Sequence, residues 1–226
     1  MTRQTRTQNR RALLSAMGTA AAGVALASVP ARAQDASKAA APAGSAPAAF
    51  APARHTEDAW LDTLPGKHRV IIDVAPVAGG SEALLYANNL FTANKSGYGL
   101  EDKDVATVVC FRHNATIFGY NDKMWAKYGK AIADTSKYEN PRAGEPFTAN
   151  PLRNIDAMAK RGVHFAVCGL ASRRIAGLVA TAVGAKTDDI LAELKENLVA
   201  NGHFAAAGVI ATTRAQEYGY ALLIAG

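Results

Sequence analysis

The chain has 226 residues, of which 49% are hydrophobic and 19% are charged. This composition fits one globular domain, or a small domain with appendages, and excludes disordered, fibrous and coiled-coil proteins. The net charge of +6 depends on five arginines among the first 33 residues, which contain no acidic residue. Without these five, 20 of the 25 basic residues remain against 19 acidic ones, a net charge of +1. The body of the protein is therefore nearly neutral, which argues against a nucleic-acid-binding surface.

Residues 1–33 have the layout of an export signal. A basic stretch ends in Arg10 and Arg11, a weakly apolar run follows over residues 12–29, and an Ala-x-Ala pattern ends at Ala33. The paired arginines and the glycines within the apolar run resemble a twin-arginine signal. The run is rich in Ala and Gly, unlike a membrane anchor, so we expect cleavage after Ala33 and no stable membrane anchor afterwards. A twin-arginine signal implies export in the folded state and hence a periplasmic location.

Residues 34–54 are predicted to be a flexible linker. Ten of these 21 residues are Ala and three are Pro, with almost no large apolar side chain. Such a segment cannot bury enough surface to offset the entropy lost on ordering. The folded domain is therefore predicted to span residues 55–226, a length that suits one hydrophobic core.

Short apolar runs alternate with helical patterns along this domain. Strands are predicted at residues 69–75, 104–111, 163–168, 208–211 and 220–224, and helices at residues 81–96, 115–128, 152–161, 170–183 and around 190–198. Residues 134–150 are predicted to be a polar loop, whose composition suits a lid, an assembly contact or, equally, a disordered segment. Parallel strands need crossover connections, which are nearly always right-handed. The pattern therefore predicts an α/β fold with a mostly parallel five-stranded sheet.

The loop after the first predicted strand contains Gly79, Gly80 and Ser81. It lacks the Gly-x-Gly-x-x-Gly spacing for a dinucleotide and the Gly-Lys-Ser/Thr ending of a nucleotide-binding loop. The chain also lacks a Gly-x-Ser-x-Gly elbow and a His-Glu-x-x-His pair, which argues against the common hydrolase templates. Two interpretations of the loop stay open: a tight turn with Ser81 as helix N-cap, or an anion site lined by these residues at a helix N-terminus.

Cys168 is the candidate reactive residue. It ends an apolar strand, and a helix is predicted to begin just after it. In an open α/β sheet the ligand site lies at the carboxyl ends of the strands, which is where Cys168 is expected. The helix N-terminus and the nearby Arg173 and Arg174 favour the thiolate, which is the form that attacks sulfur. The two arginines are one residue apart and point about 100° apart on a helix, so we expect at most one of them to face the thiol. The alternative is that Cys168 is a small core residue.

The segment over residues 162–174 resembles the cysteine segment of the DsrE/DsrF/TusD family of small sulfur-relay proteins. That pattern is a Gly-Val, an apolar strand, a Cys and then a helix bearing Arg, and residues 108–113 and 207–220 are similar to the family in the same order. The resemblance implies a flavodoxin-like three-layer fold, assembly into trimers or hexamers, and no organic cofactor. It also implies that Cys168 accepts a sulfane sulfur as a persulfide and passes it to a partner protein.

Cys110 lies inside the apolar run of the second strand, as a buried core residue would. Exported proteins often pair their cysteines, and the two in this chain allow a single disulfide. In the flavodoxin-like order the first strand lies between the second and the third. Cys110 and Cys168 would then be two strands, or about 9–10 Å, apart, beyond the limit of about 7 Å between Cα atoms for a disulfide. We therefore expect two free thiols.

His113 follows the second strand, at the same end of the sheet as Cys168. It is a candidate base, thiolate partner or anion contact, and the alternative is a solvated loop histidine. Cys110, His113, Cys168 and His203 are not spaced like zinc or copper ligands, so no metal site is expected.

Three functions agree with these observations. The first is a periplasmic sulfur-relay or thiol protein that carries sulfane sulfur on Cys168, with His113 nearby. The second is a non-catalytic oligomeric binding or scaffold protein with the same fold. The third is a binder of a small ligand or metal at the loop that contains Gly79 and Gly80. We rank them in this order, because the cysteine segment is the most informative feature of the sequence.

Overall fold

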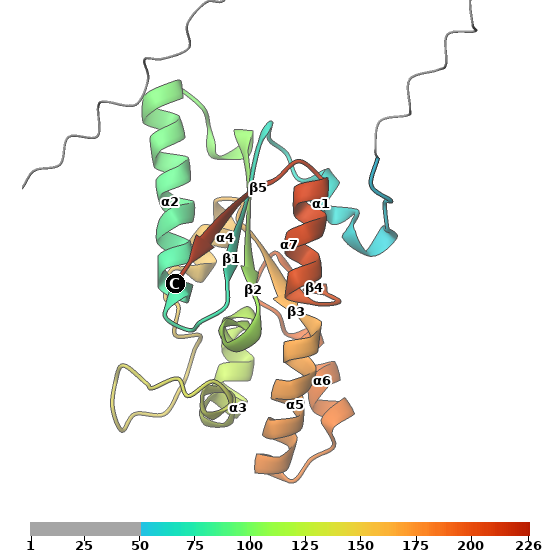
Figure 1. The fold of residues 1–226 in the computed structure, drawn as a ribbon. Helices are drawn as coiled ribbons and strands as arrows, with labels where there is room; N and C mark the ends of the chain where they lie inside the picture. Colours follow the sequence, from blue (N-terminus) through green and yellow to red (C-terminus); the bar gives the residue numbers. More distant parts are fainter. Residues whose placement is uncertain (1–50) are drawn as a thin grey trace, which may run out of the picture. The chain divides into compact units, whose positions relative to one another are not determined.

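The computed structural model describes residues 51–226. The predicted signal and residues 34–50 of the predicted linker lie outside the described residues. The described part contains one sheet of five parallel strands, namely β1 (His68–Val74), β2 (Val105–Phe111), β3 (His164–Cys168), β4 (Gly202–Ala205) and β5 (Ala221–Ala225). Helices cover both faces of this sheet (Figure 1). The predicted three-layer, flavodoxin-like α/β architecture is thus confirmed in its layers and strand directions.

The order of the strands across the sheet is β4-β3-β2-β1-β5. The expectation that the first strand lies between the second and the third is therefore wrong: β2 pairs with both β1 and β3. All seven residues of β2 are buried, as expected for a central strand covered on both faces. β5 is an edge strand, and four of its five residues are exposed.

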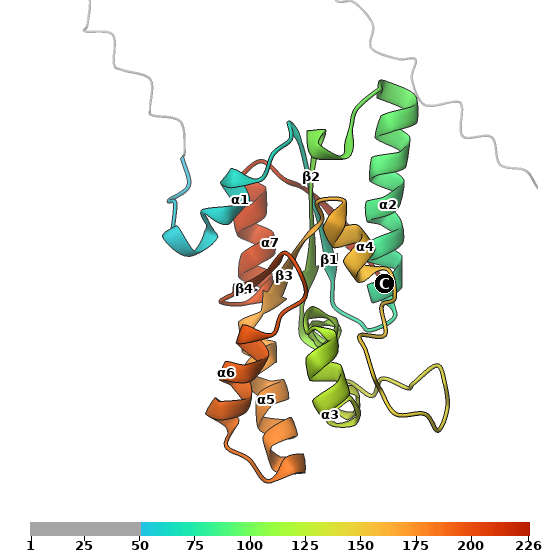
Figure 2. The same ribbon diagram turned by 180° about the vertical axis from the view of Figure 1, so that it is seen from behind.

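Two groups of helices cover the sheet. The first comprises α2 (Gly79–Tyr98), α3 (Asp122–Thr135), α4 (Ile155–Lys160), α5 (Gly169–Val183) and α6 (Thr187–Glu196); the second comprises α1 (Trp60–Thr63) and α7 (Gly208–Glu217). Three 3-10 helices complete the described elements: η1 (Thr56–Asp58), η2 (Asp102–Asp104) and η3 (His113–Gly119). Figures 1 and 2 show α2 and α4 on one side of the sheet and α1 and α7 on the other. We call these sides the α2 face and the α7 face.

The handedness of the connections explains this distribution. From β1 to β4 each strand lies beside the previous one, always in the same direction, so right-handed crossovers place their helices on one face. The last connection runs back from β4 across the sheet to β5. Because its direction is reversed, its helix α7 covers the opposite face.

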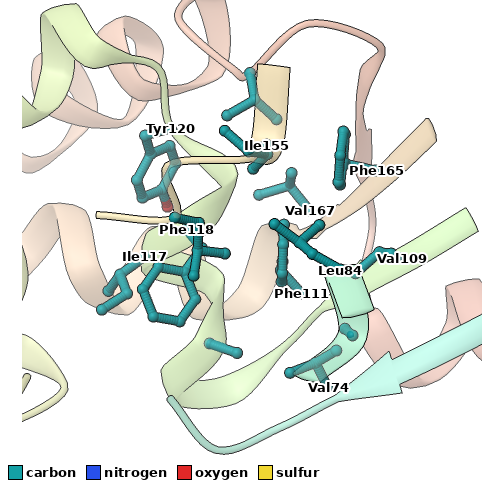
Figure 3. Packing of buried hydrophobic residues seen from close by; sticks show 14 of the residues in the cluster. Val74, Leu84, Val109, Phe111, Ile117, Phe118, Tyr120, Ile155, Phe165 and Val167 are labelled. Carbon is teal, nitrogen blue, oxygen red and sulfur yellow. The ribbon is translucent and has the colours of Figure 1, made fainter. Parts of the chain in front are cut away.

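The larger hydrophobic core lies on the α2 face. Figure 3 shows Val74, Val109 and Phe165 of three neighbouring strands pointing into it. Phe111 and Phe165 stack there with ring centroids 5.7 Å apart. A smaller core on the α7 face contains the alternate residues of the same strands, such as Ile71 and Val108. Each strand of the sheet centre thus contributes to both cores, which accounts for its continuous apolar sequence.

Most predicted elements are present, and three boundaries were wrong. Residues 208–211 begin α7 instead of forming a strand, and the fourth strand is the short β4. The predicted helix over residues 115–128 is divided into η3 and α3, because Asn121 caps a new helix by accepting the N–H of Met124 at 3.3 Å. Ser81 is not an N-cap: α2 begins at Gly79, so Ser81 lies within its first turn.

Candidate functional site at the carboxyl end of the sheet

The carboxyl ends of β3 and β4 form the switch point of the sheet. β3 leads into α5 on the α2 face, whereas its neighbour β4 leads into α7 on the α7 face. Neighbouring strands whose connections leave on opposite faces open a crevice, and ligands of α/β proteins bind in such crevices. Cys168 is the last residue of β3 and pairs with Ala205, the last residue of β4. The topology therefore places Cys168 at this switch point.

Cys168 is also the N-cap of α5. Its Sγ accepts the N–H of Ala171 at 3.4 Å. It packs against Ala171 and Ala207, and only 6% of the residue is exposed. The sulfur thus lies at the N-terminal, positive end of a 15-residue helix and accepts a hydrogen bond from a backbone N–H of its first turn.

A charged pair lies beside this sulfur. The Arg112 guanidinium donates to both carboxylate oxygens of Asp73, from Nε at 2.7 Å and from Nη2 at 2.8 Å. The β2–β3 ladder pairs Phe111 with Val167. Arg112 and Cys168 each follow one of these two residues, so they lie opposite each other. The hydrogen bond to Asp73 raises the pKa of Arg112, and the neighbouring thiols contribute in the same direction. The arginine therefore stays charged, and Asp73 balances its charge.

Cys110 lies beneath this pair, fully buried on the α7 face. It pairs with Asp73 across the β1–β2 ladder, and its thiol donates to the carbonyl of Gly208 at 3.5 Å. Burial, with a smaller contribution from the charge of Asp73, raises the pKa of the Cys110 thiol far above its usual range. Cys110 is therefore a neutral core thiol and a poor nucleophile.

Both cysteines are free. The predicted separation by two strands is wrong, because Cys110 and Cys168 lie on adjacent strands and on the same face of the sheet. Cys110 pairs with Ala166, two residues before Cys168, so the cysteines are diagonal neighbours. Residues in this relation have Cα atoms about 7–8 Å apart, at or beyond the limit of about 7 Å for a disulfide.

Arg173 and Arg174 of α5 both contact other residues. Arg173 forms an ion pair with Asp188 at 3.4 Å, and Arg174 donates to the carbonyl of Thr135 at 3.2 Å. His113 is an exposed residue at a positive φ of 52° at the start of η3, and within residues 51–226 it forms no hydrogen bond with Cys168. The charged pair beside the sulfur is instead Arg112 with Asp73.

Gly79 and Gly80 allow α2 to pack closely. A Cβ on Gly79 would lie 2.4 Å from the carbonyl oxygen of Ala225, and one on Gly80 would lie 2.6 Å from the ring of Phe118. Ser81, the next residue, is exposed. Close packing is thus sufficient to explain the two glycines, without an anion.

Asp73 and Arg112 were not singled out from the sequence. Asp73 lies near the end of a predicted strand and Arg112 directly follows another, which is a weak signal for a site residue. They are 39 positions apart, and no local pattern connects them. An acidic residue within the apolar run at residues 69–75 was the most useful available sign, because a buried carboxylate requires a partner.

Residues 51–226 hold no group of three or more side chains suited to a metal ion. In the same part of the chain, no helix has the length and apolar character needed to cross a membrane.

Comparisons with known proteins give little information on function. No family model matches the chain, and the search of curated proteins found no match. A solved structure of a protein of unknown function from Methanobacterium thermoautotrophicum is 16% identical and covers 70% of this chain and 99% of its own, with a TM-score of 0.38.

Proposed function

We propose that this protein is an exported, DsrE-like sulfur carrier in which Cys168 holds a sulfane sulfur as a persulfide. The observation that carries the proposal is the position of Cys168 at the switch point, with its Sγ accepting the N–H of Ala171 at the start of α5. The buried Cys110 thiol is not a competing acceptor, because burial keeps it protonated.

The reaction requires one nucleophilic step. The Cys168 thiolate attacks the terminal sulfur of a persulfide R–S–S⁻, a new S–S bond forms on the protein, and R–S⁻ leaves. With thiosulfate as donor, the leaving group is sulfite. In each case the charge is conserved and the sulfur moves without an added oxidant or reductant. The positive end of α5 then stabilises the terminal anion of the protein persulfide.

The surroundings of Cys168 favour a protein partner. Only 6% of Cys168 is exposed, whereas Leu170 in the first turn of α5 and Val209 and Ile210 in the first turn of α7 are exposed. Exposed apolar side chains next to a recessed reactive atom are typical of a surface that a second protein covers. This supports a protein sulfur donor or acceptor.

The proposed location is the periplasm, reached in the folded state. It rests on the twin-arginine pattern of residues 1–33, which lie outside the described residues. The protein would then act where sulfur compounds enter from the surroundings.

Intact mass after exposure to polysulfide or thiosulfate tests the function. We expect the wild-type protein to gain one sulfur atom per chain and the Cys168→Ser variant to gain none. Cys110→Ser is the matched control, because its thiol is buried and protonated, and it should gain sulfur as the wild type does. Absence of the gain in all three proteins, or its loss in Cys110→Ser alone, would contradict the assignment to Cys168.

The second candidate is an oligomeric binding or scaffold protein, and the edge strand β5 favours it. Leu222, Leu223 and Ile224 of this strand are exposed, and β5 pairs only with β1 among the described strands. An apolar edge without charged residues is a surface that natural proteins usually cover. Assembly into trimers or hexamers through β5 agrees with both candidates.

Sedimentation velocity tests this assembly surface. We expect the wild type to sediment as an oligomer and Ile224→Lys to sediment as a monomer, because the substitution places a charge at an apolar contact. Ile224 is 67% exposed, so the monomer should stay folded. Leu85→Lys, at a position on α2 that is 54% exposed, is the control and should leave the oligomer intact. An unchanged Ile224→Lys oligomer would exclude β5 as the contact.

A further inference from the structure

Two histidines contact each other on the α7 face, at the ends of β3 and β4 remote from Cys168. His164 Nδ1 and His203 Nε2 are 2.9 Å apart, a hydrogen-bonding distance. The ring of Trp60 stacks on His203 with centroids 3.8 Å apart and an angle of 5° between the planes. All three side chains are partly buried. The cluster lies outside the proposed sulfur site, and the proposed function does not use it.

Trp60 belongs to a segment that lies across the α7 face. We call residues 54–64 the N-terminal latch; they include η1 and α1, and residues 65–67 connect them to β1. Leu61 and Leu64 of the latch are buried in the core of this face. The carbonyl of Leu61 accepts hydrogen bonds from the Tyr220 hydroxyl at 2.7 Å and from Arg69 Nη1 at 3.0 Å.

Polar contacts hold the first part of the latch against α7 and its C-terminal end. The guanidinium of Arg54 lies 3.8 Å from the centre of the Tyr218 ring. Asp58 and Arg214 form an ion pair at 3.7 Å. Contacts of these kinds are individually weak. The latch is thus held by a small apolar contact, the Trp60 stack and a few polar interactions, which makes it a candidate for local opening.

The short distance between the two imidazoles limits the number of protons that the pair can bind. A hydrogen bond between two ring nitrogens needs one proton between them, so at least one of these nitrogens must be an acceptor. One additional proton on the pair is compatible with this bond, and the Trp60 ring can stabilise that single charge. A second additional proton would set two N–H groups against each other at 2.9 Å. The rings would then have to separate.

The charged groups of the surrounding elements are engaged in other contacts. Asp62 of α1 pairs with Arg69, and Arg214 of α7 pairs with Asp58 of η1 and with Glu217. Lys195 of α6 lies over the ring of Phe204 on β4. No hydrogen bond or ion pair joins a carboxylate to either histidine within residues 51–226.

Burial lowers the pKa of His164, and burial together with the charge of His164 lowers the pKa of His203 to about 4. A lowered pKa in the docked state means that the undocked state binds protons more readily. Docking is therefore fully stable above the ordinary histidine pKa of about 6.5 and is weakened as the pH falls from there towards 4.

We propose that the His164–His203 pair is an acid-sensitive clasp: protonation of both imidazoles separates the rings, displaces Trp60 and releases the N-terminal latch from the α7 face. Release exposes the apolar surface that Leu61 and Leu64 cover. In a compartment whose pH follows the surroundings, this would couple the exposed surface of the domain to external acidity.

Hydrogen exchange of the purified full-length chain tests the clasp. Exchange is measured by mass spectrometry between pH about 7 and about 4, and the rates are corrected for the pH dependence of intrinsic exchange. We expect protection of the latch peptide to fall by at least about tenfold over this range, while the β2 peptide keeps its protection. In the His164→Asn variant, residue 164 keeps a hydrogen-bonding group but cannot be protonated. The protection of the latch peptide should therefore fall by less than about threefold over the same pH range.

Three results would overturn the proposal. The first is constant protection of the wild-type latch, and the second is an equal loss in His164→Asn. The third is a parallel loss of protection in β2, which would mean global acid unfolding instead of local release. The β2 peptide also reports whether His164→Asn is folded, and His164→Gln replaces it if it is not.

Discussion

Replacing Arg112 by Met should destabilise the protein by about 3 kcal/mol. The substitution removes both donors to the Asp73 carboxylate, and because the Asp73 side chain is only 9% exposed, water cannot solvate it in their place. Asp73→Asn should cost less, because the Arg112 side chain is 30% exposed and water can solvate its guanidinium. Urea unfolding, with the midpoint and the slope fitted separately, measures both changes.

The comparison needs a matched surface pair. Lys130 and Asp134 form an ion pair at 2.8 Å on α3, but their side chains are 85% and 64% exposed. Lys130→Met should therefore change the stability by less than about 0.5 kcal/mol. The double variant Asp73→Asn, Arg112→Met should be more stable than Arg112→Met alone, since it no longer buries an unpaired charge. Equal losses for Arg112→Met and Lys130→Met would contradict the role of burial.

The parallel α/β fold could be predicted because its signals are local. Central strands buried on both faces have continuous apolar sequences, and β1, β2 and β3 were found for this reason. β4 was missed because it has only four residues, three of them partly exposed, and contains no Val, Ile or Leu. The following residues 208–211 are apolar, a pattern that predicts a strand, but they begin α7, where Val209 and Ile210 are exposed.

The order of the strands could not be predicted, because hydrophobic periodicity does not encode which strands are neighbours. This error changed the expected surroundings of Cys168: the structure places Cys110 on the adjacent strand β2, and Arg112 directly after it, not two strands away. The position of Cys168 itself depends only on the end of β3 and the start of α5, so its sequence signal was sufficient. The Arg112–Asp73 pair depends on the order of the strands and was missed.

Gly208→Ala should destabilise the protein by about 2 kcal/mol, an unusually large effect for so small a substitution. A Cβ on Gly208 would lie 2.3 Å from the Cβ of Arg112, an atom fixed by the backbone of the chain directly after β2. Gly208 does not have a positive φ, so the cost is steric and does not come from backbone strain. Thermal or urea unfolding gives the loss of stability.

Gly177→Ala is the matched control, because Gly177 also lies in a helix but its Cβ would approach no atom closer than 3.9 Å. Alanine should stabilise α5 there by about 0.5–1 kcal/mol, the usual helical preference over glycine. The two variants should thus change stability in opposite directions. The carbonyl of Gly208 accepts a hydrogen bond from the Cys110 thiol, and the neighbouring Ala207 packs on Cys168. A substitution that displaces the start of α7 should therefore also alter sulfur uptake by Cys168. Equal stability of Gly208→Ala and Gly177→Ala would contradict tight packing of the first turn of α7 against Arg112.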